Sequence, residues 1–234
     1  MTAGWSVLLG LVVALGGDWA VGKLSGWVTP SDRSGDDDTV TLNLTKWLGL
    51  VPMLAWVFAV EGAGLGSLTG TRLPPLALVA VVAGGVVVTF TASAVIQRVT
   101  SAFGIDGVAA GGTIQELSDR STAGILLTAV TAGVTEELLF RGFLVERLVS
   151  LTGSHLLAGA VSVVVFGAVH YRGWGLEETV EITMQGAVLV GIYLLVPSVV
   201  ALIAIHALHD GLGLLLARRA VTDDRTESAA AAES

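Results

Sequence analysis

The chain contains no cysteine, which excludes disulfide bonds, thiolate catalysis and cysteine-bound metal sites. Charged residues are also scarce: they make up 14% of the 234 residues, whereas hydrophobic residues make up 53%. Together with a mean hydropathy of +0.79, this composition excludes an ordinary soluble domain and indicates a polytopic membrane protein. The apolar runs are continuous and lack alternating segments of about ten residues, so we expect helices and not a β-barrel.

The sequence also lacks a basic cluster. It has 12 Lys and Arg residues against 20 Asp and Glu residues, and its formal net charge is -8. We therefore expect neither nucleic acid nor anionic lipid headgroups as specific partners. The acidic residues gather outside the apolar stretches, in one loop (Asp32, Asp36, Asp37 and Asp38) and in the tail (Asp223, Asp224 and Glu227), as is usual for a solvated surface.

The apolar stretches predict an all-α membrane bundle of about seven (six to eight) transmembrane helices. A long acidic loop is expected over residues 23–43, and a capping-box pattern at Thr113–Glu116 predicts a short helix before the fourth span. The expected spans cover roughly residues 4–21, 46–60, 74–96, 123–148, 156–170, 182–196 and 197–217.

We divide the chain into three parts. Residues 1–121 form N-terminal transmembrane helices and loops of unassigned role, residues 122–217 form a candidate catalytic helix bundle, and residues 218–234 form a disordered tail rich in Ala and acidic residues. An external N-terminus would leave most Lys and Arg residues in cytoplasmic segments, so we expect a multi-pass plasma-membrane protein with a cytoplasmic C-terminus.

Three ionisable residues, Glu136, Glu137 and Arg141, lie within one apolar stretch, where charged groups are costly and rarely occur without a function. Glu137 and Arg141 are four residues apart with the acid first, which favours an ion pair on one helix face. Glu136 points about 140° away from Arg141 at 3.6 residues per turn. We therefore expect Glu136 to face a cavity unpaired, with a raised proton affinity that suits a general base.

Two later apolar stretches each carry a histidine motif. Phe166 and His170 are four residues apart and share a helix face, as do His206 and Asp210. His209 is rotated by about 60° from His206 and is expected beside it. Taken alone, His170 at the end of a span is more often an interfacial or hydrogen-bonded residue, and the other two motifs are equally well explained by structural hydrogen bonds. Three polar faces on separate spans, however, are hard to explain by packing and indicate a catalytic site.

The three motifs, in this order, resemble those of the CPBP family (CAAX-processing proteases and bacteriocin-immunity proteins, also called Abi). The family pattern is E-E-x-x-x-R, then F-x-x-x-H, then H-x-x-x-N or a close variant. This chain supplies Glu136-Glu137-x-x-x-Arg141, then Phe166-x-x-x-His170, then His206-x-x-x-Asp210. The resemblance covers roughly residues 123–217, which makes 122–217 a CPBP/Abi-like bundle.

This resemblance implies intramembrane proteolysis, including removal of the last three residues after a prenylated cysteine. It implies that Glu136 activates water, with His170 helping to hold it, and that His206 and residue 210 stabilise the oxyanion. It also implies supporting roles for Glu137, Arg141 and Phe166. The expected partners are the lipid bilayer and a protein or peptide substrate, with a prenylated protein as one branch of the family would predict.

Asp210 stands where the family often has asparagine. An ionised aspartate cannot donate a hydrogen bond and would repel an oxyanion. Either Asp210 is protonated in a dry site, or it orients His206, or it binds metal; our hypothesis is that it orients or charges His206.

The metal requirement is left open by the motifs. Glutamate, histidine and aspartate are acceptable zinc ligands, and Glu136, His170, His206 and Asp210 are the candidates. The sequence has no H-E-x-x-H motif, however, and family members are described both as metalloendopeptidases and as glutamate proteases without metal. We expect a glutamate-water mechanism with no cofactor, with zinc as the alternative.

Two other functions remain as alternatives. One is a non-catalytic immunity or scaffold protein of the same family, against which the intact Glu136, His170 and His206 argue. The other is a proton-coupled transporter that uses the acidic and imidazole groups as a relay. The absence of an inverted repeat in the sequence argues against a transporter.

Overall fold

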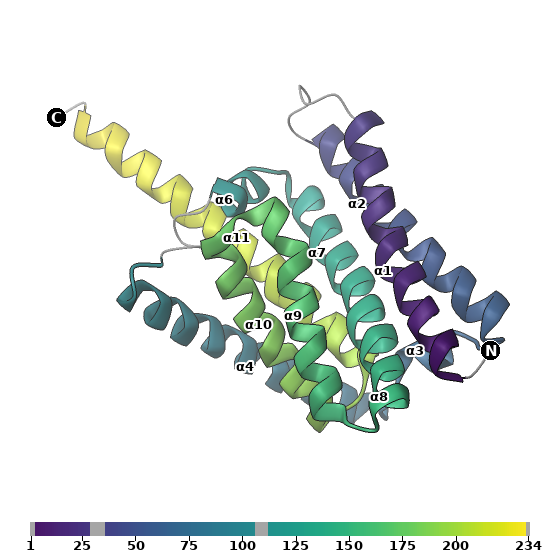
Figure 1. Cartoon of the computed structure of the whole chain (residues 1–234). Coiled ribbons are helices and arrows are strands. Elements are labelled where there is room, and N and C mark those ends of the chain that lie inside the picture. The colour runs from purple at the N-terminus through teal and green to yellow at the C-terminus, as the bar shows by residue number, and fades with distance from the viewer. Residues whose placement is uncertain (1–2, 29–35, 106–111, 233–234) are drawn as a thin grey trace.

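The computed structural model describes residues 3–28, 36–105 and 112–232, and the long elements in these ranges are all helices (Figure 1). Among these described residues, six helices are long and apolar enough to cross a membrane, and α9 adds a shorter apolar stretch. The chain is therefore an all-α, multi-pass integral membrane protein, as predicted. The six candidate spans are Gly4–Leu24, Thr39–Val60, Pro75–Ala102, Thr122–Thr152, Leu176–Leu195 and Val199–Ala220.

The first two helices, α1 (Ala3–Val28) and α2 (Asp36–Ala55), pack together as an N-terminal hairpin. Gly10 and Gly17 allow this approach, because a Cβ atom at either position would collide with Trp56 or Pro52. After Pro52, the α2 helix continues as a π-helical turn, η1 (Trp56–Val60).

The predicted acidic loop over residues 23–43 is wrong in its extent. The structure extends α1 to Val28 and starts α2 at Asp36, so three of the loop's acidic residues open a helix instead. Negative charge is favourable beside the free amides of a helix N-terminus, so a helix start at this acidic run is physically reasonable. Asp32 and Arg33 lie outside the described residues.

Three further helices connect the hairpin to the second half of the chain. They are α3 (Gly66–Thr69), α4 (Pro75–Ala102) and α6 (Gly112–Ser118). The α4 helix begins with proline in its first turn, a favoured position, and crosses the molecule steeply relative to α1 and α7 (Figure 1). The α6 helix contains Thr113–Glu116 and confirms the short helix predicted from the capping-box pattern.

One continuous rod carries the two glutamates. It consists of α7 (Thr122–Glu137), the π-helical segment η2 (Leu138–Val145) and α8 (Glu146–Thr152). Its first turn is capped by Ser121, which accepts a hydrogen bond from the Gly124 amide. The π-helical segment begins directly after Glu137, and such segments are frequent at functional sites.

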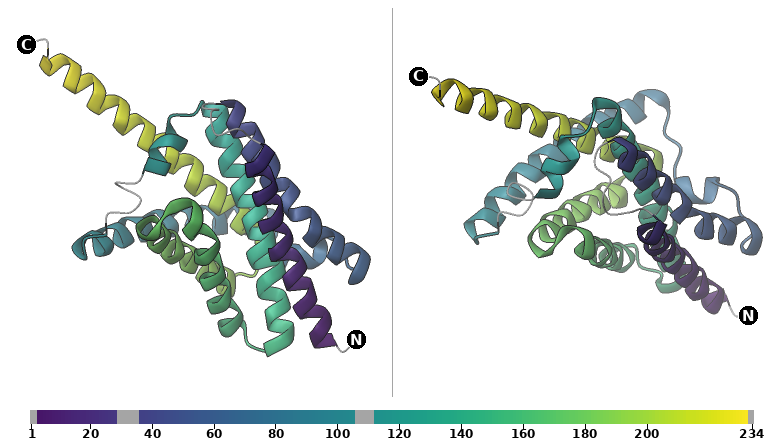
Figure 2. Two further views of the ribbon diagram at one scale, coloured as in Figure 1. Left: turned by 45° about the horizontal axis from the view of Figure 1, so that its top comes forward. Right: turned by 90° about the horizontal axis from the view of Figure 1, so that it is seen from above.

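The last three long helices, α9 (His155–Trp174), α10 (Leu176–Leu195) and α11 (Val199–Ala232), run antiparallel to their neighbours (Figure 1). Beyond the bundle, α11 projects outward as a helix to Ala232 (Figure 2). This differs from the predicted disordered tail, and the reason lies in the high helix propensity of alanine and glutamate.

Two buried apolar clusters hold the rod in place. The first lies between the N-terminal hairpin and the rod and contains Leu50, Met53, Phe140 and Phe143. The second lies against the C-terminal helices and contains Val145, Tyr193, Leu202 and Ile205. The rod is thus the central element on which the hairpin and the C-terminal helices both pack.

Replacing Gly142 of the rod with alanine is expected to lower the stability of the protein. A Cβ atom there would collide with the backbone carbonyl oxygen of Leu68 in α3, so Gly142→Ala would force α3 away from the rod. We expect the free energy of unfolding to fall by about 1–3 kcal/mol, which is typical of overpacking. The fall would be measured as a lower unfolding temperature in detergent. Gly191→Ala in α10 is the matched control, because its Cβ would meet nothing within 4 Å; equal behaviour of the two variants would contradict the expectation.

Candidate active site

Glu136 of the rod, His170 of α9 and His206 of α11 meet at one place. The Nε2 atom of each histidine lies 3.9 Å from Glu136 Oε2. The side chains of Glu136 and His170 are 12% and 14% exposed. The structure therefore brings together three predicted side chains that the sequence separates by 70 positions.

Behind this cluster, Glu137 and Arg141 form the predicted ion pair. Arg141 Nη1 donates to Glu137 Oε1 over 2.9 Å, and both side chains are fully buried. Glu137 Oε1 also lies 2.8 Å from His206 Nδ1, and Arg141 Nη2 donates to the Gly186 carbonyl over 2.9 Å. The pair thus ties α10 and α11 to the rod.

Phe166 packs against the same network. Its ring lies edge-to-face against Phe140 at 5.0 Å, and 5.1 Å from the Arg141 guanidinium carbon. The Phe166 carbonyl accepts a hydrogen bond from His170 Nδ1 over 2.8 Å, and the two rings are 4.3 Å apart. This hydrogen bond fixes the His170 ring with Nε2 facing Glu136.

His206 is held between two carboxylates. Its Nδ1 faces Glu137, and its Nε2 lies 3.3 Å from Asp210 Oδ2. If both carboxylates are ionised, both ring nitrogens must donate, so this geometry suits an imidazolium. The Asp210 side chain is 34% exposed, more than those of Glu136, His170 and His206.

Lys46 was missed as a site residue. Its Nζ atom lies 2.6 Å from Glu136 Oε1, so the expectation that Glu136 is unpaired is wrong. The sequence limits of the second span put Lys46 at its edge, whereas α2 begins at Asp36 and places Lys46 well inside. The available signal was a lysine inside an apolar stretch, which in a membrane calls for a partner.

A cavity of about 880 Å³ opens beside the cluster. It reaches from Glu136 and the site histidines to α6 and the outer part of α11. His209 lies in its wall, with Nε2 3.4 Å from Ser93 Oγ of α4 and its ring 4.7 Å from that of Phe90. His209 was expected beside His206; the structure places its ring against Ser93 and Phe90 of α4, in the wall of the cavity.

The arrangement does not suit a metal ion. Within the part of the chain that the structure describes, no three histidine or acidic side chains are placed to hold one. The Lys46 ammonium beside Glu136 would repel a divalent cation, and His206 Nδ1 is engaged with Glu137.

Comparison with protein-family models matches residues 119–212 to the Rce1-like family, described as type II CAAX prenyl endopeptidase Rce1-like. The match covers less than half of the chain but includes all three motifs. No curated protein and no solved structure matches the chain. Residues 119–212 are therefore similar to the family of CAAX-processing-type membrane proteins that the three motifs indicated.

Proposed function

We propose that this protein is an intramembrane endopeptidase that hydrolyses a peptide bond with a water activated by Glu136. The observation that carries the proposal is the convergence of His170 Nε2 and His206 Nε2 on Glu136 Oε2, at 3.9 Å each. The site borders a cavity of about 880 Å³, which is large enough to admit a short peptide segment. The similarity of residues 119–212 to a family of endopeptidases supports the reaction class.

In the proposed reaction, Glu136 takes a proton from water while the water oxygen bonds to the scissile carbonyl carbon. The carbonyl oxygen becomes an oxyanion in a tetrahedral intermediate. When the C–N bond breaks, Glu136 returns the proton to the leaving amine. Water alone is a poor nucleophile, and a positioned general base contributes typically about 10²- to 10⁴-fold.

The two histidines have different proposed roles because their hydrogen bonds differ. His170 donates from Nδ1 to the Phe166 carbonyl, so a neutral ring accepts at Nε2 and can orient the water. His206 is placed to be an imidazolium between Glu137 and Asp210, and as a cation it would stabilise the oxyanion, an electrostatic contribution that is often the largest one in catalysis.

Asp210→Asn tests the role of the aspartate. We expect kcat to fall by about tenfold, because the amide keeps the shape but removes the charge that favours the His206 imidazolium. The alkaline limb of the pH–activity profile should move to lower pH, since the imidazolium would lose its proton more readily. Full activity with an unchanged profile would contradict the proposal.

We further propose that the mechanism needs no metal. The support is the Lys46 ammonium 2.6 Å from Glu136 Oε1, in a position that disfavours a divalent cation. Chelator treatment of the purified protein should therefore leave kcat/KM unchanged within error. Loss of activity with chelator, restored by added zinc, would overturn this part of the proposal.

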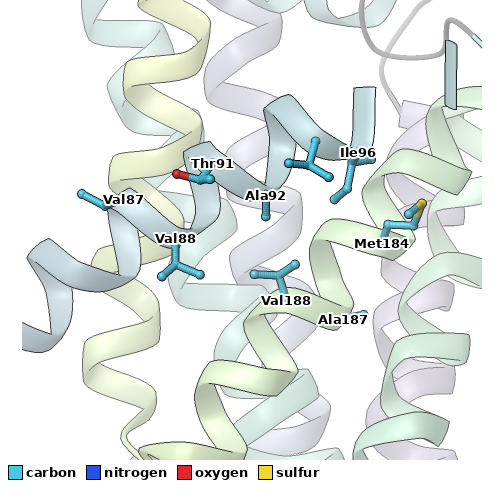
Figure 3. Close-up of a pocket in the computed structure, with 9 residues that line it drawn as sticks. Val87, Val88, Thr91, Ala92, Ile96, Met184, Ala187 and Val188 are labelled. Atoms are coloured by element: carbon cyan, nitrogen blue, oxygen red, sulfur yellow. The ribbon is translucent and has the colours of Figure 1, made fainter. Parts of the chain in front are cut away.

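A prenylated substrate is supported by an apolar groove that α4 and α10 form together. The groove has a volume of about 530 Å³ and is lined by α4 and α10. Figure 3 shows Val88 of α4 and Val188 of α10 pointing toward one another across it. Ile96 lines both the groove and the cavity, so we propose that an isoprenoid chain in the groove places its peptide in the cavity.

The cavity extends toward α6 and the outer part of α11. We propose that this end is cytoplasmic, because the segments there hold most of the basic residues. The substrate would then enter from the cytoplasmic side of the plasma membrane, and the C-terminus would be cytoplasmic.

The proposed activity is tested with detergent-purified protein and quenched peptide libraries, with and without a C-terminal farnesylated cysteine. Cleavage that requires the farnesyl group would support both the protease and its prenylated substrate. Cleavage without that requirement would support the protease alone. If none of the peptides is cleaved, while a family protease cleaves them under the same conditions, the binding alternative gains weight over the protease.

A further inference from the structure

The N-terminal hairpin supplies a charged side chain to a site whose other members lie in the family-matched segment. Lys46 Nζ is 2.6 Å from Glu136 Oε1, and Lys46 borders the same cavity. The match begins at residue 119, so it assigns no role to Lys46. Lys23, the other lysine of the chain, is exposed on α1.

The two oxygens of the Glu136 carboxylate have different partners. Lys46 binds Oε1, while Oε2 faces His170 and His206. A carboxylate held at one oxygen by a charge-assisted hydrogen bond has a fixed orientation. The lysine therefore presents Oε2 at the place where the histidines converge.

Hydrogen bonds on both sides of Lys46 fix the register of α2 against the rod. Asn43 Nδ2 donates to Thr128 Oγ1 over 3.2 Å, and Trp47 Nε1 donates to Thr131 Oγ1 over 3.2 Å. Asn43 and Trp47 are four residues apart and share a face. These two hydrogen bonds between α2 and the rod therefore hold Lys46 beside Glu136.

The surrounding charges show what the lysine does. Besides Lys46, Glu136 faces His170 of α9 and His206 of α11, with Asp210 behind His206. Asp18 of α1 packs against Gly49 and interacts electrostatically with both Lys46 and Glu136. Without Lys46, the nearest cationic group to Glu136 would be His206, which Glu137 and Asp210 already engage at its two ring nitrogens. The ionised form of Glu136 would then be less favoured in this poorly solvated region.

We propose that Lys46 is a positioning residue for Glu136: its ammonium keeps the carboxylate ionised and directs Oε2 toward His170 and His206. The inference rests on the proposed function and adds a requirement for the N-terminal hairpin, whose role is otherwise unassigned. It predicts that residues 119–212 are insufficient for activity even when folded.

The first test compares Lys46→Met, Lys46→Arg and the control Lys23→Met, all in the full chain. We expect Lys46→Met to lower kcat by about 10- to 100-fold, as for a misplaced catalytic group, with little change in KM. The acid limb of its pH–activity profile should move to higher pH, because the uncompensated carboxylate would take up a proton more readily. Lys46→Arg should recover part of kcat, and Lys23→Met should match the wild type.

The second test does not depend on activity. The infrared bands of Glu136 are assigned as those lost in Glu136→Gln, and they distinguish carboxylate from carboxylic acid. We expect carboxylate at neutral pH in the wild type and in Lys46→Arg, and a carboxylic acid in Lys46→Met. Unfolding temperatures of the same samples check that the variants are folded.

The two tests separate this inference from the proposed function. If the wild type cleaves peptides and Lys46→Met cleaves them equally well, the function stands and the inference is overturned. If no peptide is cleaved but the Glu136 band changes in Lys46→Met, the function fails while the electrostatic role of Lys46 is supported. A folded Lys46→Met with an unchanged carboxylate band overturns the inference in either case.

Discussion

Arg141→Met is expected to destabilise the bundle by about 3–5 kcal/mol, because it leaves the Glu137 carboxylate buried without its guanidinium partner. Arg141 is the largest fully buried side chain in the described part of the chain. It also donates to the Gly186 carbonyl and lies over the Phe166 ring. Three helices therefore lose a common contact in this variant.

The effect is measured as a lower unfolding temperature in detergent. The matched control is Arg147→Met. The partner of Arg147, Glu61, is 20% exposed and can be solvated, so this variant should lose less stability. The double variant Glu137→Gln/Arg141→Met should recover part of the lost stability, because it removes the unpaired buried charge. An unfolding temperature of Arg141→Met equal to that of the wild type would contradict the structural role of the pair.

Glu136→Gln is expected to lower kcat/KM by about 10²- to 10⁴-fold, the usual contribution of a positioned general base. The amide keeps the shape of the side chain and can still accept a hydrogen bond from Lys46, so the fold should be retained. The variant removes the negative charge of the side chain and with it the ability to take a proton from water. Loss of activity together with loss of folded protein would not count as support.

The control for Glu136→Gln is Glu177→Gln, the same change at an exposed glutamate at the start of α10. It should leave kcat/KM at the wild-type value. Equal loss in both variants would show that the site has been assigned to the wrong glutamate.

The sequence predicted what depends on local spacing. Glu137 and Arg141 form the ion pair that their four-residue spacing indicated, and Phe166 and His170 are in contact as their spacing implied. The apolar stretches predicted a membrane helix bundle, and its candidate spans fall within the expected number.

Contacts between distant helices could not be calculated from spacing. The Lys46–Glu136 pair depends on the register of α2 against the rod, which is fixed by Asn43 and Trp47. The four-residue spacing of Glu137 and Arg141 did not indicate the π-helical segment that begins at Leu138. The partner of Gly142, the Leu68 carbonyl in α3, depends in the same way on how two distant segments pack.

The central claim is tested most directly by mass spectrometry of one farnesylated peptide incubated with wild-type protein or with Glu136→Gln, purified in parallel. The account predicts one new C-terminus from the wild type, at the bond after the farnesylated cysteine, and intact peptide from the variant. Equal cleavage by both proteins would contradict a Glu136-activated water as the nucleophile.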